Sequence, residues 1–300
     1  MTDLLPATSK RPPKIIAYDL SKLDDQAFHE IRLQGIGGSD AGKVMGQSTY
    51  GTPWEVYHSK RGDLPRKEQT EPMYWGTVLE PVIANRWGQD HPESTLDNVD
   101  ALFQHHEFPW MLATPDRLVD DDGVLEIKTA SHWVADQWED GNVPNDYAIQ
   151  GQHYCEVLDR DWCEFAVLIG GSDYRTHRFE RDERIGQLII ERCGQFWQQV
   201  QDGTPPQSSS SDRVVDLYPS HITGEILPVS FDERAAIDRA KAIDEEIKQL
   251  KDQRDHELNV LRDAMGQAET AMDGDQVVAT WKNNKPKADG TPGARVLRLK

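Results

Sequence analysis

Apolar residues recur with two different periods along the first 200 residues, and the period predicts which segments are helices and which are strands. A spacing of three to four residues is typical of amphipathic helices, whereas strict alternation is typical of half-buried strands. The helical spacing predicts helices at residues 25–33, 73–89, 146–158 and 183–200. Two shorter helices are predicted between them, one capped by Ser39 or Asp40 and including residues 43–45, and one that starts at Pro53. Strands are predicted within residues 116–128, where two short runs form a hairpin, and at 162–169 and 174–179.

Changes in composition divide the chain into four parts. Residues 1–24 are expected to form a loosely structured leader before a domain at residues 25–205. Four consecutive serines at 208–211 cannot form a packed core, so residues 206–230 are expected to be a linker. The remaining part, residues 231–300, is expected to be a helical extension.

The extension begins with a segment rich in Ala, Glu, Lys, Leu and Arg that runs from Phe231 to Met272. Its apolar residues follow a near-heptad spacing with one skip around Arg254. This pattern predicts a long helix or a helical hairpin that packs against a neighbour, either another helix or the main domain. Two terminal strands, at 276–281 and 295–299, are expected to form a short hairpin around a basic loop.

The segment at residues 114–128 is the clearest candidate for chemistry. Its two predicted strands join across an Asp-Asp-Gly turn, which favours a tight reversal. Because side chains alternate along a strand, Glu126 and Lys128 share one face, and the apolar residues between them share the other. Asp116 can turn toward the same face, which would place two carboxylates and a lysine around one point. Such a point suits a hard divalent cation with a water molecule beside it.

An ordinary solvated hairpin would show the same local pattern. Charged residues alternate with apolar ones on any half-exposed strand, and an Asp-rich turn is commonly only a polar turn. The hairpin alone therefore leaves both interpretations open.

Composition narrows the class of protein. The formal net charge is −19, and hydrophobic residues make up 37% of the 300 residues, as expected for a globular chain. The sequence shows neither an apolar run long enough for a transmembrane helix nor a signal peptide, so a soluble intracellular protein is expected. The three cysteines have no CxxC spacing, which argues against a cysteine zinc site or an iron–sulfur cluster.

The acidic charge bears on nucleic-acid binding. A protein that contacts phosphates usually has a basic footprint, so any such site must be local. Residues 281–300 form one local exception, because they hold six basic residues and one acidic residue.

Four segments occur in an order that resembles a known nuclease family: Arg32 to Ala41, Trp75 to Pro81, Thr114-Pro115-Asp116 with Glu126-Ile127-Lys128, and Gln150 to Tyr154. Together they resemble the PD-(D/E)xK nuclease superfamily and, within it, the phage-type exonucleases of the YqaJ and lambda exonuclease family. The resemblance covers roughly residues 25 to 200. It implies an α/β (α+β) fold with a restriction-endonuclease-like core, in which helices flank a central mixed β-sheet, followed here by a C-terminal helical extension.

The resemblance also implies a metal centre. Residues that match Asp116 and Glu126 are metal ligands in the family, together with the backbone carbonyl that matches Ile127. The lysine that matches Lys128 assists the attacking water, and the helical glutamate that matches Glu80 helps to hold metal or a metal-bound water. The implied cofactor is Mg2+, for which Mn2+ can substitute. Mg2+ would supply both a nucleophile at neutral pH and relief of charge on the phosphate.

Five further residues are implied to bind DNA. Gln150 and Tyr154 are four residues apart and share one helix face, so they are the favoured pair beside the active site, with Gln152 as a third candidate. Arg32 and Ser39 match residues that contact a terminal 5′ phosphate. An arginine fork beside backbone amides makes a sound anion pocket, although pairing of Arg32 with a surface acid such as Glu30 is an equal alternative.

The function implied is an Mg2+-dependent DNA exonuclease that degrades one strand of linear duplex ends, in the 5′-to-3′ direction, to expose single strands for phage-type recombination. The resemblance further implies a homotrimer, a single-strand annealing protein as partner, no membrane association, and the cytoplasm of a bacterial host carrying a phage or prophage. Two alternatives remain open: a non-catalytic module that binds DNA ends or protein, and an endonuclease of the same superfamily.

Overall fold

The computed structural model describes residues 12–65, 68–286, 291 and 293–300. The chain forms two compact units, residues 1–220 and 221–300, and each is described by itself. The first eleven residues of the expected leader and part of the expected basic loop, residues 287–290 and 292, lie outside the described residues. Within the part that the structure describes, no helix is both long enough and apolar enough to cross a membrane.

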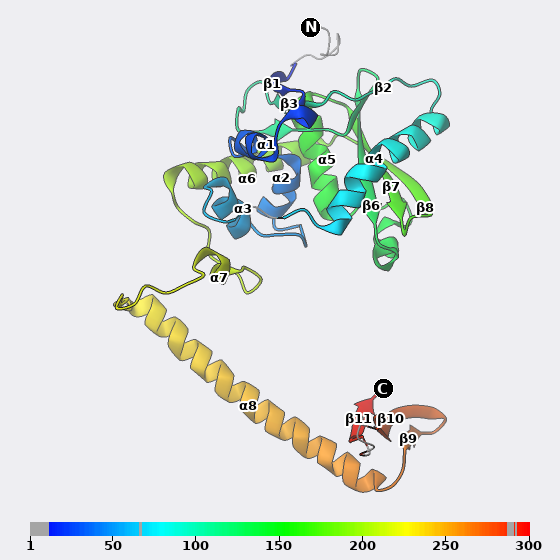
Figure 1. Cartoon of the computed structure of the whole chain (residues 1–300), viewed down its shortest axis with the longest axis vertical. Helices are drawn as coiled ribbons and strands as arrows, with labels where there is room; N and C mark the ends of the chain where they lie inside the picture. The colour runs from blue at the N-terminus through cyan, green and yellow to red at the C-terminus, as the bar shows by residue number, and fades with distance from the viewer. Residues whose placement is uncertain (1–11, 66–67, 287–290, 292) are drawn as a thin grey trace. The chain divides into compact units, whose positions relative to one another are not determined.

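The first unit is built around a five-stranded mixed sheet with the strand order β2-β5-β6-β7-β8. Its strands are β2 (Leu96–Asp97), β5 (Arg117–Val119), β6 (Gly123–Ala130), β7 (Trp162–Ile169) and β8 (Asp173–Glu180). Strands β2, β6, β7 and β8 are labelled in Figure 1. Strands β6 and β7 are parallel, whereas β5 is antiparallel to β6 and β8 is antiparallel to β7. The expected central mixed sheet is therefore confirmed.

Helices cover this sheet, as expected for the fold class. The helices of the unit are α1 (Asp25–Arg32), α2 (Gly38–Val44), α3 (Pro53–Lys60), α4 (Glu71–Asp90), α5 (Asn145–Leu158), α6 (Glu183–Asp202) and α7 (Val214–Leu217). Two 3-10 helices, η1 (Leu20–Lys22) and η2 (His132–Trp138), complete it.

The two faces of the sheet pack against different helices. Leu125 and Ile127 of β6 lie in a cluster with Ile83 and Trp87 of α4. The alternate residues of the same strands, such as Val124, lie in the larger cluster that includes α5 and α6. Since Glu126 and Lys128 follow the parity of Val124, they point toward the face that carries α5. The face of β6 that carries Glu126 and Lys128 is therefore covered by α5 and is not open to solvent.

The predicted hairpin is present with a defined register. Arg117 pairs with Leu125, and Val119 pairs with Gly123 across the turn, where Asp120 adopts a left-handed conformation with φ 45°. A Cβ atom on Gly123 would lie 2.1 Å from the indole of Trp162, so the start of β6 requires a glycine.

A second sheet was not expected from the pattern. Strand β1 (Lys14–Tyr18) pairs with β3 (Ala101–Gln104), which pairs with β4 (Leu112–Ala113). Part of the segment that was expected to be a loose leader is therefore a strand, because its apolar run at 15–17 is partly buried against the rest of the unit.

The second unit begins with one helix, α8 (Phe231–Met265), which is followed by a three-stranded antiparallel sheet in the order β11-β10-β9. These strands are β9 (Thr270–Asp273), β10 (Gln276–Asn283) and β11 (Arg295–Leu299). The segment forms a single helix and not a helical hairpin. The helix is followed by Gly266, whose φ is 50°. The helix was expected to continue to Met272, but it ends at Met265, and Thr270–Asp273 form strand β9, which joins the predicted hairpin as a third strand.

Candidate active site

The open end of the β5–β6 hairpin brings two carboxylates together. Asp116 precedes β5, and its Oδ2 accepts a hydrogen bond of 2.7 Å from the backbone N–H of Ile127. The backbone N–H of Asp116 in turn donates to Oε1 of Glu126 over 3.2 Å. Each strand therefore fixes the carboxylate of the other through its backbone.

Lys128 completes this group. Its ammonium Nζ lies 2.9 Å from Oε2 of Glu126, whose side chain is 1% exposed. The same ammonium lies 5.4 Å from the ring centroid of Tyr147 and 5.8 Å from that of Phe165. The structure thus places Asp116, Glu126 and Lys128 around one point, and aromatic rings shield the lysine from solvent on one side.

The electrostatics of this point favour a positive partner. Burial raises the pKa of Glu126 to about 7, and the nearby charge of Asp116 adds to this rise while Lys128 opposes it. Burial alone would lower the pKa of Lys128, but Glu126 and Asp116 outweigh it and raise this pKa above its ordinary value. Lys128 therefore balances only part of the negative charge of Glu126 and Asp116, and negative charge remains in excess at this point.

Glu80 approaches from α4 but is held by a different cation. Its Oε1 accepts a hydrogen bond of 2.7 Å from Arg117, which also donates to the backbone carbonyl of Asp116. Burial raises the pKa of Glu80, and Asp116 contributes to the rise. Arg117 therefore ties the helical glutamate to the hairpin.

Carboxylate oxygens of Asp116, Glu126 and Glu80 are the ligand type that hard divalent cations prefer, and their mutual repulsion is what such a cation would relieve. Among the described residues, no three acidic, histidine or cysteine side chains already form a cluster that could hold an ion. The residues suit the cation in chemistry and sign of charge, while Glu80 would have to turn from Arg117 to join the others.

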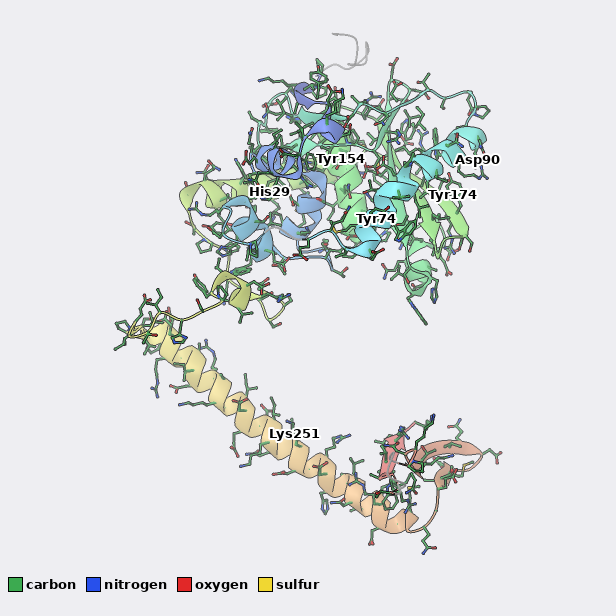
Figure 2. All side chains as sticks on the ribbon, in the orientation of Figure 1. His29, Tyr74, Asp90, Tyr154, Tyr174 and Lys251 are labelled. Carbon is green, nitrogen blue, oxygen red and sulfur yellow. The ribbon has the colours of Figure 1, made fainter. Side chains whose placement is uncertain are left out.

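Helix α5 contributes the predicted Gln150 and Tyr154, of which Tyr154 is labelled in Figure 2. Nε2 of Gln150 donates to Oε2 of Glu126 over 2.8 Å. The hydroxyl of Tyr154 lies 3.4 Å from Nε2 of Gln150 and donates to the carbonyl of Thr114 over 3.3 Å. The spacing of four residues therefore places both side chains at the candidate site.

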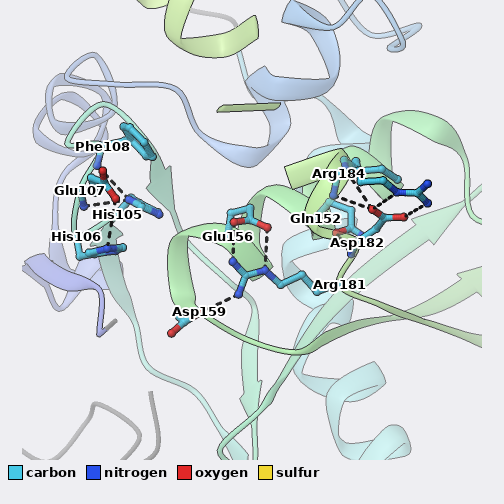
Figure 3. A network of polar contacts seen from close by, with 11 residues as sticks. His105, His106, Glu107, Phe108, Gln152, Glu156, Asp159, Arg181, Asp182 and Arg184 are labelled. Carbon is cyan, nitrogen blue, oxygen red and sulfur yellow. Dashed lines mark hydrogen bonds and ion pairs between the residues drawn. The ribbon is translucent and has the colours of Figure 1, made fainter. Parts of the chain in front are cut away.

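Gln152 points elsewhere. Its Nε2 donates to the carbonyl of Glu180 and its Oε1 accepts from the N–H of Asp182, each over 3.0 Å. Figure 3 shows Gln152 within this network at the start of α6, beside the pair of Glu156 and Arg181. The structure does not bring Gln152 together with Glu126, because a residue two positions from Gln150 lies on another face of the helix.

Arg32 and Ser39 meet beside a cavity. A guanidinium nitrogen of Arg32 donates to the hydroxyl of Ser39 over 3.2 Å. The alternative partner, Glu30, instead accepts a hydrogen bond from Gln26. Arg32 also lines a cavity of about 320 Å³, whose other polar lining residues include Asp40, Lys43 and Lys60. A narrower cavity links Arg32 with Thr114 and Tyr154.

Helix α2 connects this cavity to the carboxylate centre. A Cβ atom on Gly38 would lie 2.5 Å from Cε1 of Tyr154 and 2.9 Å from Cγ of Gln150. The glycine therefore allows α2 to lie directly against the two side chains that reach Glu126.

Sequence reasoning missed Arg117, Lys60 and Tyr147. Lys60 lies 2.7 Å from Oδ2 of Asp40 and donates to the carbonyl of Arg32 over 2.8 Å. A charged residue within an apolar strand could have drawn attention to Arg117, whereas Lys60 and Tyr147 carry no distinctive local signal.

Comparison with known proteins identifies the family of this chain. Residues 27–161 match the YqaJ-like viral recombinase domain. The protein YqaJ of Bacillus subtilis (strain 168) is 31% identical over 284 residues, which cover 92% of this chain and 88% of that protein. The crystal structure of an alkaline exonuclease (LHK-Exo) from Laribacter hongkongensis is similar with a TM-score of 0.52 and 23% identity, over 60% of this chain and 94% of that one. A second structure of that exonuclease, in complex with dAMP, matches equally well. The chain therefore belongs to the YqaJ family, and over 60% of its length it has a fold similar to that of this alkaline exonuclease.

Proposed function

We propose that this protein is an Mg2+-dependent DNA exonuclease that degrades one strand of linear duplex ends in the 5′-to-3′ direction. The observation that carries the proposal is the convergence of Asp116, Glu126 and Lys128 at the open end of one hairpin in a member of the YqaJ family. A similar fold in an alkaline exonuclease that binds dAMP supports a nucleotide product. The products would serve phage-type recombination in the cytoplasm of a bacterial host, with a trimeric enzyme and a single-strand annealing protein as partner.

Within this proposal, residues 25–205 form the nuclease domain, residues 206–230 form a linker, and residues 231–300 form an extension. Asp116, Glu126, the carbonyl of Ile127 and Glu80 would hold Mg2+, and Mn2+ would substitute. When bound, the cation supplies a nucleophilic water at neutral pH and neutralises charge on the phosphate.

The side chains around the centre have separate tasks. The ammonium of Lys128 is a donor placed beside Glu126, where it can orient the attacking water and add positive charge near the phosphate. Gln150 fixes one oxygen of Glu126, and Tyr154 lies beside Gln150 where it can reach the DNA backbone. Ordering these groups before the substrate arrives lowers the cost of reaching the transition state.

Arg32 and Ser39 would bind the terminal 5′ phosphate. The cavity that Arg32 lines also contains Lys43 and Lys60 against the acids Asp40 and Glu55, so it carries a small excess of positive charge although the whole chain is acidic. A phosphate bound at that end would set the direction of degradation.

The first test is release of nucleotides from linear duplex DNA with 5′ phosphates in the presence of Mg2+. We expect Lys128→Ala to reduce the rate by about 10²–10³-fold, the usual cost of removing one donor that stabilises charge in the transition state. Asp116→Asn should reduce the rate at least as far, because it weakens a proposed metal ligand. The matched control is Asp121→Asn, because Asp121 is an exposed acid in the turn of the same hairpin. Undiminished release by folded Lys128→Ala protein would overturn the proposal, and cleavage of closed circular DNA would favour an endonuclease.

A second readout separates metal binding from activity. Mg2+ that binds only the folded protein raises the midpoint of thermal unfolding. We expect this rise for the unsubstituted chain and for Asp121→Asn, but not for Asp116→Asn. Binding of DNA ends without cleavage, in either Mg2+ or Mn2+, would favour the non-catalytic module.

A further inference from the structure

The C-terminal sheet of the second unit departs from the acidic character of the chain. Residues 281–300, which include the end of β10 and all of β11, hold six basic residues and one acidic residue. In α8, by contrast, acidic residues outnumber basic ones. The sheet lies outside residues 27–161, which match the family domain, so that match does not account for its charge.

The register of the strands places the exposed cations on one face of this sheet (β9, β10 and β11 are labelled in Figure 1). Lys282 of β10 lies opposite Val296 of β11, and Arg298 lies opposite Thr280. Because side chains alternate along a strand, Lys282, Arg298 and Lys300 share this face. All three side chains are exposed.

The opposite face of the sheet is turned toward α8. Ala279 on that face is 1% exposed, and Trp281 lines a cavity together with residues of α8 such as Val260. The guanidinium of Arg295 lies 3.7 Å from the ring centroid of Trp281 and donates to the carbonyl of Gly266, just past the end of α8, over 2.8 Å. The face that carries the three cations is therefore the outer face of the sheet.

Little of the positive charge on the outer face is neutralised within the unit. A guanidinium nitrogen of Arg298 donates to Oδ1 of Asn284 over 3.4 Å, and this amide carries no charge. Lys282 pairs with Glu269, but the two side chains are 49% and 67% exposed, so water screens the pair. Between described residues, neither Arg298 nor Lys300 lies within ion-pair distance of an Asp or Glu side chain. The outer face therefore offers positive charge to an anion outside the chain.

The side chains between the cations indicate which polyanion fits. Thr270 and Thr280 lie opposite each other on the outer face and carry hydroxyl groups. Lysine, arginine and threonine side chains are usual donors to DNA phosphates. Proteins that hold single strands also use aromatic rings on which bases stack, and no residue of these three fully described strands that shares the outer face is aromatic. The chemistry favours the backbone of duplex DNA over a single strand.

We propose that the outer face of the β9–β11 sheet binds the phosphate backbone of duplex DNA without reading its sequence, through Lys282, Arg298 and Lys300. The identity of the polyanion rests on the proposed function, whereas the contact itself lies in the second unit, apart from the candidate active site. Because the chain joins this contact to the nuclease unit, binding here raises the local concentration of duplex DNA for that unit.

The test is the salt dependence of duplex binding by the full chain in EDTA, which removes the metal that the proposed cleavage requires. Each phosphate contact contributes about 0.9 to the slope of log K against log salt concentration. The sheet variant, Lys282→Gln with Arg298→Gln and Lys300→Gln, should therefore reduce this slope by about 2–3. Fluorescence anisotropy of a labelled blunt duplex, at salt concentrations from about 50 to 200 mM, measures the slope.

The matched control is Lys248→Gln with Lys251→Gln and Arg254→Gln, which removes the same charge from exposed positions of α8 (Lys251 is labelled in Figure 2). Its slope should differ from that of the unsubstituted chain by less than about one. Arg298→Lys keeps the charge and should keep the slope. Circular dichroism verifies that each variant is folded. Equal slopes for the two triple variants would overturn the proposal, and a larger loss with a single strand of the same length would overturn the choice of duplex DNA.

Failure of this proposal and failure of the proposed function give different results. Nucleotide release in Mg2+, together with equal slopes for the two triple variants in EDTA, would overturn only the contact at the sheet. A reduced slope for the sheet variant of a chain that releases no nucleotide would overturn only the proposed exonuclease activity.

Discussion

Two buried pairs of a carboxylate and a lysine lie in the first unit. Their contact distances are similar, but the pKa of the carboxyl group is shifted in opposite directions in the two pairs. Glu126 and Lys128 are 2.9 Å apart at the hairpin, and Asp40 and Lys60 are 2.7 Å apart beside Arg32. Burial raises the pKa of Glu126 to about 7. Burial also acts to raise the pKa of Asp40, but its cationic neighbours lower it well below its usual range.

The neighbours explain the difference. Asp116 places a second negative charge beside Glu126. Around Asp40 the extra charges are positive: Arg32 and Lys43 act together with Lys60. Burial lowers the pKa of Lys60, and the charges of Arg32 and Lys43 add to this fall, while Asp40 raises this pKa. The same two chemical groups, a carboxylate and an ammonium, therefore favour a cation at the hairpin and an anion beside Arg32. The reason is that the nearest additional charge is negative at Glu126 and positive at Asp40.

The largest stability effect should come from breaking the pair at the cavity. Lys60→Met leaves the buried charge of Asp40 without its closest partner, and loss of one member of a buried pair costs about 3–5 kcal/mol. The control is Lys22→Met, which removes an exposed ion pair with Asp19 and should cost about 0–1 kcal/mol. Urea denaturation of both variants measures the two free energies. Similar costs for both variants would show that Asp40 is not held by Lys60.

The two pairs should respond to pH with opposite sign. Folded Glu126 keeps its proton up to a pH of about 7, whereas the unfolded carboxyl loses it near 4.5, so stability should fall by at most about 3 kcal/mol as the pH rises through this window. Folded Asp40 stays ionised below its ordinary pKa of 3.8, so its contribution is lost only as the pH falls below that value. Urea titrations in EDTA, from pH 4.5 to 8, should show the decline in the unsubstituted chain and a flatter profile in Glu126→Gln. An unchanged slope in that variant would contradict the assignment of the decline to Glu126.

The smallest effect on stability should come from the contact between α2, beside the Arg32 cavity, and the side chains of α5 that reach Glu126. Gly38→Ala inserts a methyl group against Tyr154 and Gln150, and overpacking of this kind costs about 1–3 kcal/mol. Gly37→Ala is the matched control, because its methyl group would lie 3.6 Å from Arg32, an ordinary contact. If Gly38→Ala also slows nucleotide release while Gly37→Ala does not, α2 positions the two side chains that reach Glu126. Equal unfolding free energies for the two variants would rule out a tight contact there.

Local periodicity predicted much of the first unit. The hairpin, strand β7 and helices α1, α5 and α6 lie close to their expected positions, because each is long or strongly patterned. Strands β2 and β4, of two residues each, carry too little pattern to be recognised. The β9 strand was assigned to the preceding helix, since its apolar spacing continues that of α8 and only Gly266 marks the end.

The candidate site was predicted less evenly. The grouping of Asp116, Glu126 and Lys128 follows from strand parity and the turn, both of which are local. The contact of Gln150 with Glu126, 24 residues apart in the chain, depends on helix α5 packing on one face of the sheet. Helix periodicity places Gln152 on another face of α5 than Gln150, but its partners, Glu180 and Asp182, are known only from the packing of α5.

The sequence by itself determined the hairpin, the parity that separates Glu126 and Lys128 from Leu125 and Ile127, and the order of segments that identifies the YqaJ family. Tertiary structure alone decided that α5 covers the polar face, that Arg117 holds Glu80, and that Lys60 lies beside Asp40. The physical reason is the separation along the chain of the residues that interact. Alternation and turn preference are set by neighbouring residues, whereas burial and the third charge that fixes each pKa come from segments distant in the chain.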